Sequence, residues 1–484
     1  MTAARVEELR LHKDAIVSLL KKEISDVPSI PVGPRPESIP LAHAQQRLWF
    51  LHQLGLVGAA YNLPMALCFE GSLDIAALEC SLTEIVRRHE SLRTRVESRD
   101  GEAVQIVDAP RPCVPAQIDL SDLESEARRC ELARLIQNEG EQLFDLSTGP
   151  LIRASVVTLS PVLHVLLLTV HHIVSDSWSQ GILVRELAAL YRAFSLGEPS
   201  PLADLPLQYA DYALWQREWL QGDVLQQQLD YWQRRLIGAP PTLELPTDRP
   251  RPAVASFKGG AVSFELSPQL SRSLQELAQR ERATPYMVLL AAFFVLLSRW
   301  SGQKDLLIGS PLAGRRHRQL EPLIGFFVNT LIMRGELSAS PTFTDFLAQV
   351  KETTLGAYAH QDVPFEQLVD ELQPVRDLSR QPVFQVSFSL QNVPAAAVEG
   401  QGPRFRGMDR EHVTAKFDLT LFMTETPTGL HGMFEYASDL FDRQTIERLS
   451  GRFALLLQGI VEDPRRRCIE VPLVSEPESP LSPE

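Results

Sequence analysis

The feature that most constrains this chain is a mostly apolar run that ends in two adjacent histidines. Residues 162–170 form the run, and the letters HHIVSDS follow directly at 171–177. A short apolar run of this kind predicts a buried strand, and successive side chains on a strand point to opposite faces. His171 and His172 therefore cannot share a face while the strand continues. One histidine is a candidate for chemistry, and the other is a candidate for structure.

The length of the chain predicts two lobes. At 484 residues the chain exceeds the size at which a single hydrophobic core stops growing. An N-terminal helix and a linker are expected over 1–40, an N-terminal lobe over 41–225 and a C-terminal lobe over 226–473. The acidic end at 474–484, which is rich in Pro and Ser, is expected to be a disordered tail or a linker.

The N-terminal helix, expected over 5–24, has apolar residues at helical spacing among many charges, which is typical of an amphipathic helix. Two interpretations remain open. The helix packs on the next domain as part of a linker, or it docks on a partner protein. We favour the linker.

Helical and strand patterns alternate in both halves, which predicts an α/β chain. The two halves have a similar order of elements, as a pseudo-duplicated fold would. Helices are expected over 75–89, 127–139, 181–196, 268–281, 285–300 and 442–462. Strands are expected over 163–170, 261–266, 306–308 and 383–390, with a further strand that includes Phe434 and Tyr436.

Composition bears on partners and location. The formal net charge of −14 disfavours nucleic acid or an anionic membrane as the main partner, although residues 315–318 supply a local basic patch. Five scattered cysteines without a C-x-x-C pair predict no disulfide framework and are typical of a reducing compartment. The sequence has no apolar signal region at its N-terminus and no run of membrane-spanning length. We therefore predict a cytoplasmic protein.

The motifs that are missing from the sequence narrow its chemistry. There is no G-x-S-x-G elbow, phosphate-binding G-x-x-x-x-G-K-[ST], G-x-G-x-x-G or H-E-x-x-H, and two adjacent strand histidines diverge, which is poor zinc geometry. A histidine at a strand end suits proton transfer, because its ordinary pKa is about 6.5. A histidine satisfied within a core would fit the same position. Asp176 could orient an imidazole, or it could be a buried carboxylate paired with an arginine.

The letters at 171–177 resemble the HHxxxDG signature of nonribosomal peptide synthetase condensation domains and of the wider chloramphenicol acetyltransferase-like superfamily. Six further stretches are similar to the ordered motifs of that family, in the same order and at similar distances. The resemblance covers essentially residues 41–472 and is highly specific. The six stretches are AHAQQRLW (42–49), RHESLRT (88–94), YADYALW (209–215), IGFFVNT (324–330), HQDVPFE (360–366) and RDLSRQP (376–382).

The resemblance implies two lobes of acetyltransferase type, each a two-layer α+β sandwich, arranged as a V with a tunnel at their interface. Two carrier-protein thioesters would enter from opposite faces on phosphopantetheine arms. In that setting His172 would face the tunnel as the catalytic residue, and His171 would pack structurally. Asn329 and Trp178 are candidates for the tunnel lining.

The implied reaction is attack of a carrier-bound aminoacyl amine on an acyl or peptidyl thioester, which gives an amide and a free carrier thiol. Because an α-amino group has a pKa of about 8, His172 would position the amine and manage its proton. The backbone N–H near Ser177 is a candidate donor to the oxyanion. The implied partners are donor and acceptor peptidyl carrier proteins and a downstream adenylation domain. No bound cofactor and no metal are implied, since the substrates are carried on phosphopantetheine or supplied as acyl-CoA.

Other motif residues resemble scaffold rather than chemistry. Asp176 is similar to a family aspartate that serves structure by pairing with an arginine, and Arg315 is its candidate partner. If this pair is buried, its loss would be a folding defect. Four further motif residues are expected to be buried contacts, namely Arg47, Trp49, Tyr209 and Trp215.

The chain departs from the family pattern at three positions. Ser177 stands in the place of the family glycine, Ala42 in that of the first-motif serine, and Val96 in that of the aromatic residue that ends the second motif. Ser177 is the most serious departure, because a side chain there would narrow the tunnel or require a positive φ at a cost of roughly 1 kcal/mol. Ser177 therefore bears on whether the domain is fully active.

Three functions follow from these observations. The main prediction is an amide-forming condensation domain. The runner-up is a starter condensation domain, which N-acylates the first amino acid from acyl-CoA or a discrete carrier, and Met1 would suit that form. The third is a non-catalytic platform that recruits carrier-linked peptides or a tailoring enzyme. Ser177 favours the platform, and an intact His172 opposes it.

Overall fold

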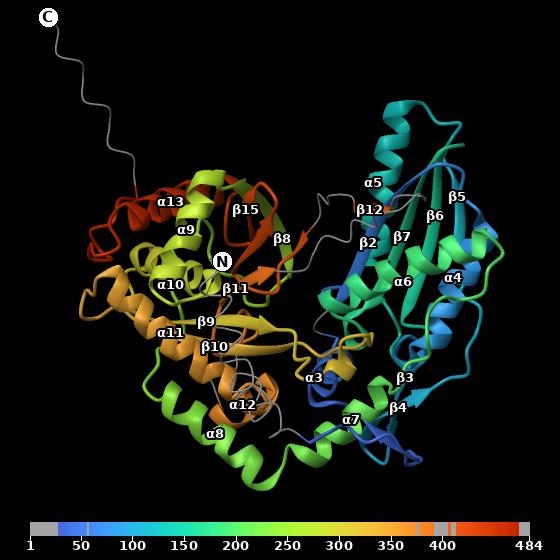
Figure 1. The fold of residues 1–484 in the computed structure, drawn as a ribbon, viewed down its shortest axis with the longest axis horizontal. Helices are drawn as coiled ribbons and strands as arrows, with labels where there is room; N and C mark the ends of the chain where they lie inside the picture. Colours follow the sequence, from blue (N-terminus) through green and yellow to red (C-terminus); the bar gives the residue numbers. More distant parts are fainter. Residues whose placement is uncertain (1–27, 56–57, 374–376, 392–404, 408–412, 474–484) are drawn as a thin grey trace, which may run out of the picture.

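The computed structural model describes residues 28–55, 58–373, 377–391, 405–407 and 413–473. The helix expected over 5–24 and the tail expected over 474–484 lie outside these residues, as does Arg376 of the last motif. Two lobes stand side by side, one built around a five-stranded sheet and the other around a seven-stranded sheet (Figure 1).

The first lobe is a sheet with helices on both faces. Its strand order is β12-β2-β7-β6-β5. Because strand side chains alternate between faces, Leu166 and Leu168 of β7 pack with α4 and α6, whereas Val165 and Leu167 pack with α5. The elements are β2 (Asn62–Glu70), α4 (Ile75–Arg88), β5 (Ala116–Asp119), α5 (Ser125–Glu141), β6 (Ile152–Ser160), β7 (Leu163–His171) and α6 (Ser177–Ser195).

The second lobe has the strand order β10-β9-β11-β14-β15-β8-β13, in which β9, β11 and β14 run parallel to one another. Its helices lie against this sheet (Figure 1). The strands are β8 (Lys258–Glu265), β9 (Asp305–Leu312), β10 (Asn329–Glu336), β11 (Val386–Gln391), β13 (Val413–Thr414), β14 (Leu419–Thr426) and β15 (Gly429–Ala437). The helices are α9 (Pro268–Arg280), α10 (Pro285–Ser301), α11 (Phe343–Ala359) and α13 (Arg443–Glu462).

Helix α10 forms the centre of the second lobe, because every residue from Met287 to Leu297 is buried. It packs against α9, α11 and α13, so an all-round apolar helix is covered on every side. The Thr284 side chain accepts a hydrogen bond from the Met287 N–H at the start of the helix, and Gly302, with φ of 78°, ends it. In the described chain no single helix is long and apolar enough to cross a membrane, and α9 with α10 would qualify only as a pair bent by 105°.

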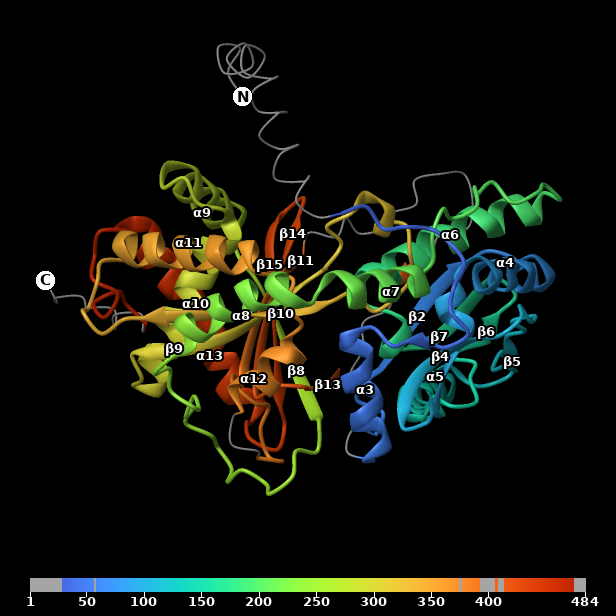
Figure 2. The same cartoon turned by 90° about the horizontal axis from the view of Figure 1, so that it is seen from below.

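Several elements join the two lobes. Strand β12 (Phe405–Gly407) comes from the second half of the sequence but pairs antiparallel with β2 of the first lobe. Helices α7 and α8 follow one another beneath the two lobes (Figures 1 and 2). The remaining elements are β1 (Ile39–Pro40), α3 (His43–Gln53), η1 (Glu90–Arg93), β3 (Thr94–Arg99), β4 (Glu102–Val107), η2 (His172–Val174), α7 (Tyr209–Trp219), α8 (Gly222–Leu236), η3 (Arg318–Leu320) and α12 (Phe365–Leu372).

Each helix and strand predicted within the described residues overlaps an observed element, and two of the differences have a clear cause. Helix α6 begins at Ser177 rather than 181, because the Asp176 side chain caps its first turn. Strand β11 begins at Val386 rather than 383, because Val383 has a φ of 72°, which no strand residue adopts. The predicted lobe boundary at 225 falls inside α8, whose later residues belong to the core of the second lobe.

Candidate active site

His171 is the last residue of β7, and its side chain is 4% exposed. The Ile173 N–H donates to His171 Nδ1 at 3.1 Å, so the ring proton is on Nε2. Burial, with a smaller effect from His52, lowers the pKa of His171 to about 3. The ring packs edge-on against Phe144, with 5.9 Å between centroids. These contacts are those of a neutral core histidine.

His172 has a different environment, because the strand ends before it. It begins the short 3₁₀ turn η2, and its backbone N–H donates to the Tyr61 carbonyl at 2.8 Å. Its Nδ1 lies 2.8 Å from the Ser175 carbonyl oxygen. A carbonyl can only accept, so Nδ1 carries the proton and Nε2 keeps its lone pair. The alternation of a strand therefore does not place the second ring; the turn does.

The His172 imidazole is held in its neutral form. The ring is half-buried against Phe326, at 4.7 Å between centroids, and Tyr61, at 6.1 Å. Burial first, and then the charge of Lys416, lower the pKa of His172 well below its ordinary value. Within the described ranges Nε2 makes no hydrogen bond to protein. A neutral ring with a free Nε2 lone pair can accept a proton from a bound group.

Asp176 joins the two lobes from a fully buried position. Its Oδ1 lies 3.3 Å from Nη2 of Arg315, whose side chain is 2% exposed. The carboxylate also accepts from the Ser179 N–H at 2.8 Å, which caps α6, and from the Phe327 N–H at 3.1 Å. Arg315 in turn donates to Ser179 Oγ at 2.8 Å and to the Leu323 carbonyl at 2.8 Å. The predicted pair is thus present within a hydrogen-bond network, in which Arg315 Nε is buried without a partner in the described chain.

The backbone of the fifth motif, residues 324–327, is bonded almost entirely to side chains of the first half. Ser91 Oγ donates to the Ile324 carbonyl at 2.7 Å, and Tyr209 Oη donates to the Phe326 carbonyl at 2.7 Å. Ser179 Oγ accepts from the Gly325 N–H and donates to the Gly325 carbonyl, at 3.1 and 2.9 Å. Polar side chains from two motifs, together with Ser179 of α6, therefore fix this segment beside His172.

His89 of the second motif belongs to the same junction. Its Nδ1 accepts from the Ile324 N–H at 3.3 Å, and its Nε2 lies 2.8 Å from Glu186 Oε2. The first bond places the ring proton on Nε2, where it is donated to the carboxylate. Arg88 Nε donates to the other oxygen of Glu186 at 3.0 Å. The second motif is therefore a structural support of the fifth.

Glycine is required at two positions of this junction. A Cβ on Gly325 would lie 2.1 Å from Cδ2 of Tyr209, and one on Gly314 would lie 2.0 Å from the Phe327 carbonyl oxygen. Gly314 also has a φ of 65°. Gly325 allows the segment that follows β9 to lie directly on α7 of the first lobe, and Gly314 allows the residues after β9 to lie against the Phe327 backbone.

Ser177 does not need the unusual backbone that the sequence led us to expect. It is the first residue of α6, its φ is not positive, and its side chain is exposed. The expectation of a positive φ is therefore wrong, because Asp176 in extended conformation provides the turn. Trp178 is 38% exposed, and its Nε1 donates to the Glu321 carbonyl at 3.0 Å, so it contacts the second half of the chain.

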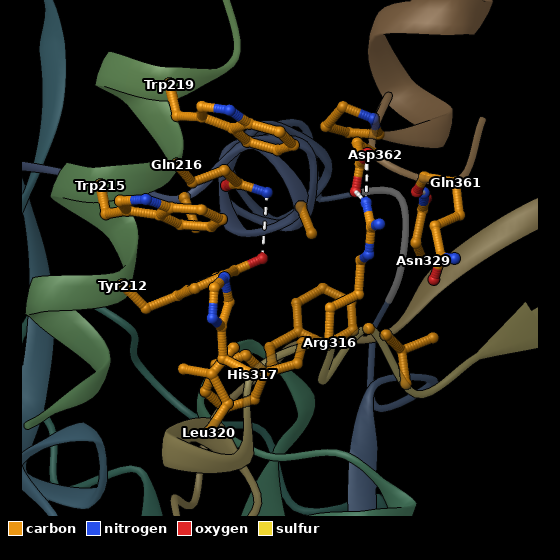
Figure 3. A pocket seen from close by; sticks show the side chains of 17 residues that line it. Tyr212, Trp215, Gln216, Trp219, Arg316, His317, Leu320, Asn329, Gln361 and Asp362 are labelled. Atoms are coloured by element: carbon orange, nitrogen blue, oxygen red, sulfur yellow. Dashed lines mark hydrogen bonds and ion pairs between the residues drawn. The ribbon is translucent and has the colours of Figure 1, made fainter. Parts of the chain in front are cut away.

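Asn329 lines a cavity between α7 and the loops around Arg316 and Asp362 (Figure 3). Its amide is fully used: Nδ2 donates to the Gln361 and Val363 carbonyls, each at 2.8 Å, and Oδ1 accepts from two backbone N–H groups. The cavity volume of about 50 Å³ holds a few water molecules. His172 does not line it, although Phe326 lines it and packs on His172.

A family model described as the condensation domain matches residues 36–480. The chain belongs to the condensation-domain family.

This condensation domain is 49% identical, over 96% of its length, to a linear gramicidin synthase protein of Brevibacillus parabrevis, of which it spans 6%. Among solved structures it is similar to an X-domain in complex with OxyB from teicoplanin biosynthesis, with a TM-score of 0.84, 33% identity and coverage of 93% of this chain and 99% of that one. It is also similar to a four-domain nonribosomal peptide synthetase bound to AMP and glycine, with a TM-score of 0.81, 25% identity and coverage of 92% and 35%.

The sequence analysis of this condensation domain missed two residues that the structure places beside His172. Tyr61 precedes β2, and Lys416 lies between β13 and β14, with its Nζ 4.8 Å from the centroid of the Tyr61 ring. Neither stands in a quoted motif. The only signal for Lys416 was a lone lysine within a stretch of strand pattern. Motif spacing alone cannot predict a contact with a histidine more than two hundred positions earlier.

Proposed function

We propose that this domain catalyses amide formation between an acyl or peptidyl thioester and the amine of a carrier-bound aminoacyl thioester. The observation that carries the proposal is the state of His172. Its Nδ1 proton is held by the Ser175 carbonyl, and its Nε2 has no hydrogen-bond partner among the residues that the structure describes. This is the form that orients an amine and accepts its proton.

The reaction needs only modest base strength. The nitrogen of the neutral amine attacks the thioester carbon, a C–N bond forms, and the carbonyl becomes an oxyanion. Collapse of this intermediate breaks the C–S bond, and the proton lost by the nitrogen passes by way of His172 Nε2 to the departing thiolate. Because the α-amino pKa is about 8, positioning contributes as much as deprotonation.

The proposed oxyanion donor is the backbone N–H of Ser177. Ser177 is the first residue of the nineteen-residue helix α6, and first-turn amides have no partner within their own helix and lie at its positive end. Asp176 fixes this end of α6 beside the turn that carries His172. A complex with a tetrahedral mimic whose oxygen lies far from this amide would refute the assignment.

We place the chemistry in a tunnel between lobes arranged as a V, reached by donor and acceptor carrier proteins from opposite sides. The substrates would be carried on phosphopantetheine, with no cofactor held by the domain itself. The relatives that it matches are much longer proteins, which supports an adjoining adenylation domain. Trp178 donates to the second half of the chain, and Asn329 lines a cavity together with residues of both halves. Their place in the tunnel wall is part of this proposal.

A turnover assay tests the proposed function. A donor thioester and an aminoacyl carrier protein are incubated with the domain, and the carrier is analysed by intact-protein mass spectrometry. His172→Ala should abolish the amide product, because no group then takes the proton, whereas His171→Gln should keep most of it if the protein folds. A parallel reaction with acyl-CoA as donor distinguishes the starter form. Equal product from His172→Ala and the wild type would disprove the assignment.

A second function is favoured by one specific observation. The solved structure in complex with OxyB is described as an X-domain rather than a condensation enzyme, and this domain is 33% identical to it. A platform of this kind would bind a carrier-linked peptide or a tailoring enzyme without forming product. Binding of the aminoacyl carrier with no amide at any pH would support the platform.

A further inference from the structure

Lys416 is a charged residue beside His172 that the proposed mechanism does not yet use. It lies in the short connection between β13 and β14 of the second lobe, and its side chain is half-buried. The Nζ atom is 4.8 Å from the centroid of the Tyr61 ring of the first lobe. An ammonium group over an aromatic face at this distance is a cation–π contact, here made between the two lobes.

Tyr61 links Lys416 to His172 in two ways. Its carbonyl accepts from the His172 N–H at 2.8 Å, and its ring stands 6.1 Å from the imidazole, edge to face. The ring that supports the ammonium group is therefore part of the residue that fixes the histidine backbone. A displacement of Lys416 would therefore shift Tyr61, which contacts His172 through its carbonyl and its ring.

The pKa of Lys416 reflects two opposing effects. Burial lowers it to about 8, against a smaller effect of Glu435 of β15. Burial raises the pKa of Glu435 to about 7, against the effect of Lys416. Of the two groups, Lys416 is the one whose charge acts on His172.

The other charged groups near this site are accounted for. His171 is neutral, and beyond Tyr61 the Nη1 of Arg47 in α3 lies 3.4 Å from Oε1 of Glu366 in α12, so these two charges offset one another. Phe326, which packs on the other side of the imidazole, carries no charge. Lys416 is therefore the principal cation acting on His172 from the described chain.

We propose that Lys416 is a positioning residue for His172. Its ammonium group, seated on Tyr61, brings a positive charge from the second lobe to the imidazole and so favours the neutral ring that the reaction requires. The inference deepens the proposed function, because a neutral His172 is needed to accept the proton of the amine. It also makes the protonation state of a first-lobe residue depend on contact with the second lobe.

The direct test is a histidine titration that needs no substrate. The protein is labelled with ¹³C at histidine Cε1, and the His172 signal is identified as the one lost in His172→Gln. Lys416→Met should raise the pKa of His172, because the nearby positive charge is gone, and Lys416→Gln should do the same. Lys416→Arg retains the charge and should leave the pKa depressed. Lys304→Met, at an exposed position before β9, is the matched control and should also leave it depressed.

The pH profile of the reaction is the second measurement. In Lys416→Met the acid limb of turnover should move to higher pH, and the rate above that limb should stay near the wild-type rate, because burial still keeps the imidazole neutral at neutral pH. A purely structural defect would lower the rate at every pH. Thermal melts of the two neutral variants identify either one that fails to fold.

The outcomes separate the two proposals. An unchanged His172 titration in folded Lys416→Met and Lys416→Gln would overturn the role of Lys416, whether or not the domain is active. If the wild type forms no amide at any pH but its His172 pKa rises on loss of Lys416, the role of Lys416 stands and the proposed function fails.

Discussion

At the scale of single residues, Asp176 and His172 have roles that follow from what surrounds each atom. Asp176 is fully buried and shared between a helix cap, a backbone N–H and Arg315. Removal of one member of such a pair strands the other charge. We therefore expect any loss of activity in an Asp176 variant to follow from a loss of fold.

Asp176→Ala should lower the free energy of unfolding by about 3–5 kcal/mol, and Arg315→Met by a similar amount. Arg316→Met is the matched control. Arg316 is the next residue along, and it is partly exposed and paired with Asp362, so its loss should cost less than about 1 kcal/mol. Chemical denaturation followed by circular dichroism measures all three. A fully stable Asp176→Ala protein with no activity would contradict the structural role.

Only those features of the site that depend on neighbouring residues or on a family motif could be predicted from the sequence. The strand rule predicted different roles for His171 and His172, although the turn η2 rather than strand alternation places the second ring. The resemblance to a family paired Asp176 with Arg315. The tautomer of His172 depends on the Ser175 carbonyl, and its charge environment depends on Lys416 of the second lobe. Neither a backbone turn nor a contact between the lobes produces a periodic pattern of residues in the sequence, so neither could be predicted from it.

At the scale of elements, α3 shows a helix start that lacks its usual side-chain acceptor. Ala42 is the N-cap residue, and Gln45 accepts from its backbone N–H at 3.1 Å. One half of a capping box is thus formed, while the half that needs a hydroxyl is missing. The departure from the family serine at Ala42 is a loss of this cap.

Ala42→Ser should therefore stabilise the domain by about 1 kcal/mol, because the hydroxyl would accept from the Gln45 N–H. Ala44→Ser, inside the first turn of the same helix, is the control and should destabilise by about 0.5 kcal/mol through helix propensity. The urea midpoints of the two variants measure the difference. A midpoint lowered in both would show that the buried site has no room for the hydroxyl.

The elements that sequence predicted best are those with a complete internal pattern. Helix α9 has Ser267 as its cap, Pro268 at its first position and one apolar face, and α10 is apolar from Met287 to Leu297. Strand β12, by contrast, has three residues, and its partner β2 lies more than three hundred positions away. A strand that short carries no alternation to detect, so the crossing between lobes could not be predicted.

At the scale of the whole molecule, several histidines of the first lobe are buried and neutral. Burial lowers the pKa of His171 to about 3 and of His43 to about 4, and it also lowers that of His89. His89 contacts the second lobe through the Ile324 N–H. By contrast, His171 packs on His52, and the His43 N–H donates to Gln216, both within the first half of the chain. Their protonation therefore bears first on the stability of the first lobe.

The domain should lose stability as the pH falls below about 6.5. Below this pH the histidines of the unfolded chain gain a proton, while the buried ones do not. The unfolded state therefore binds more protons, and the free energy of unfolding decreases as the pH decreases. Each buried histidine adds up to about 1.4 kcal/mol per pH unit to this slope. Glu435, whose pKa is raised, changes the stability with the opposite sign, so the slope of the wild type combines both effects.

The difference between the wild type and His171→Gln isolates the contribution of one histidine. Urea midpoints are measured from neutral to acidic pH, and they should fall less steeply in the variant. Parallel curves would show that His171 is protonated in the folded state.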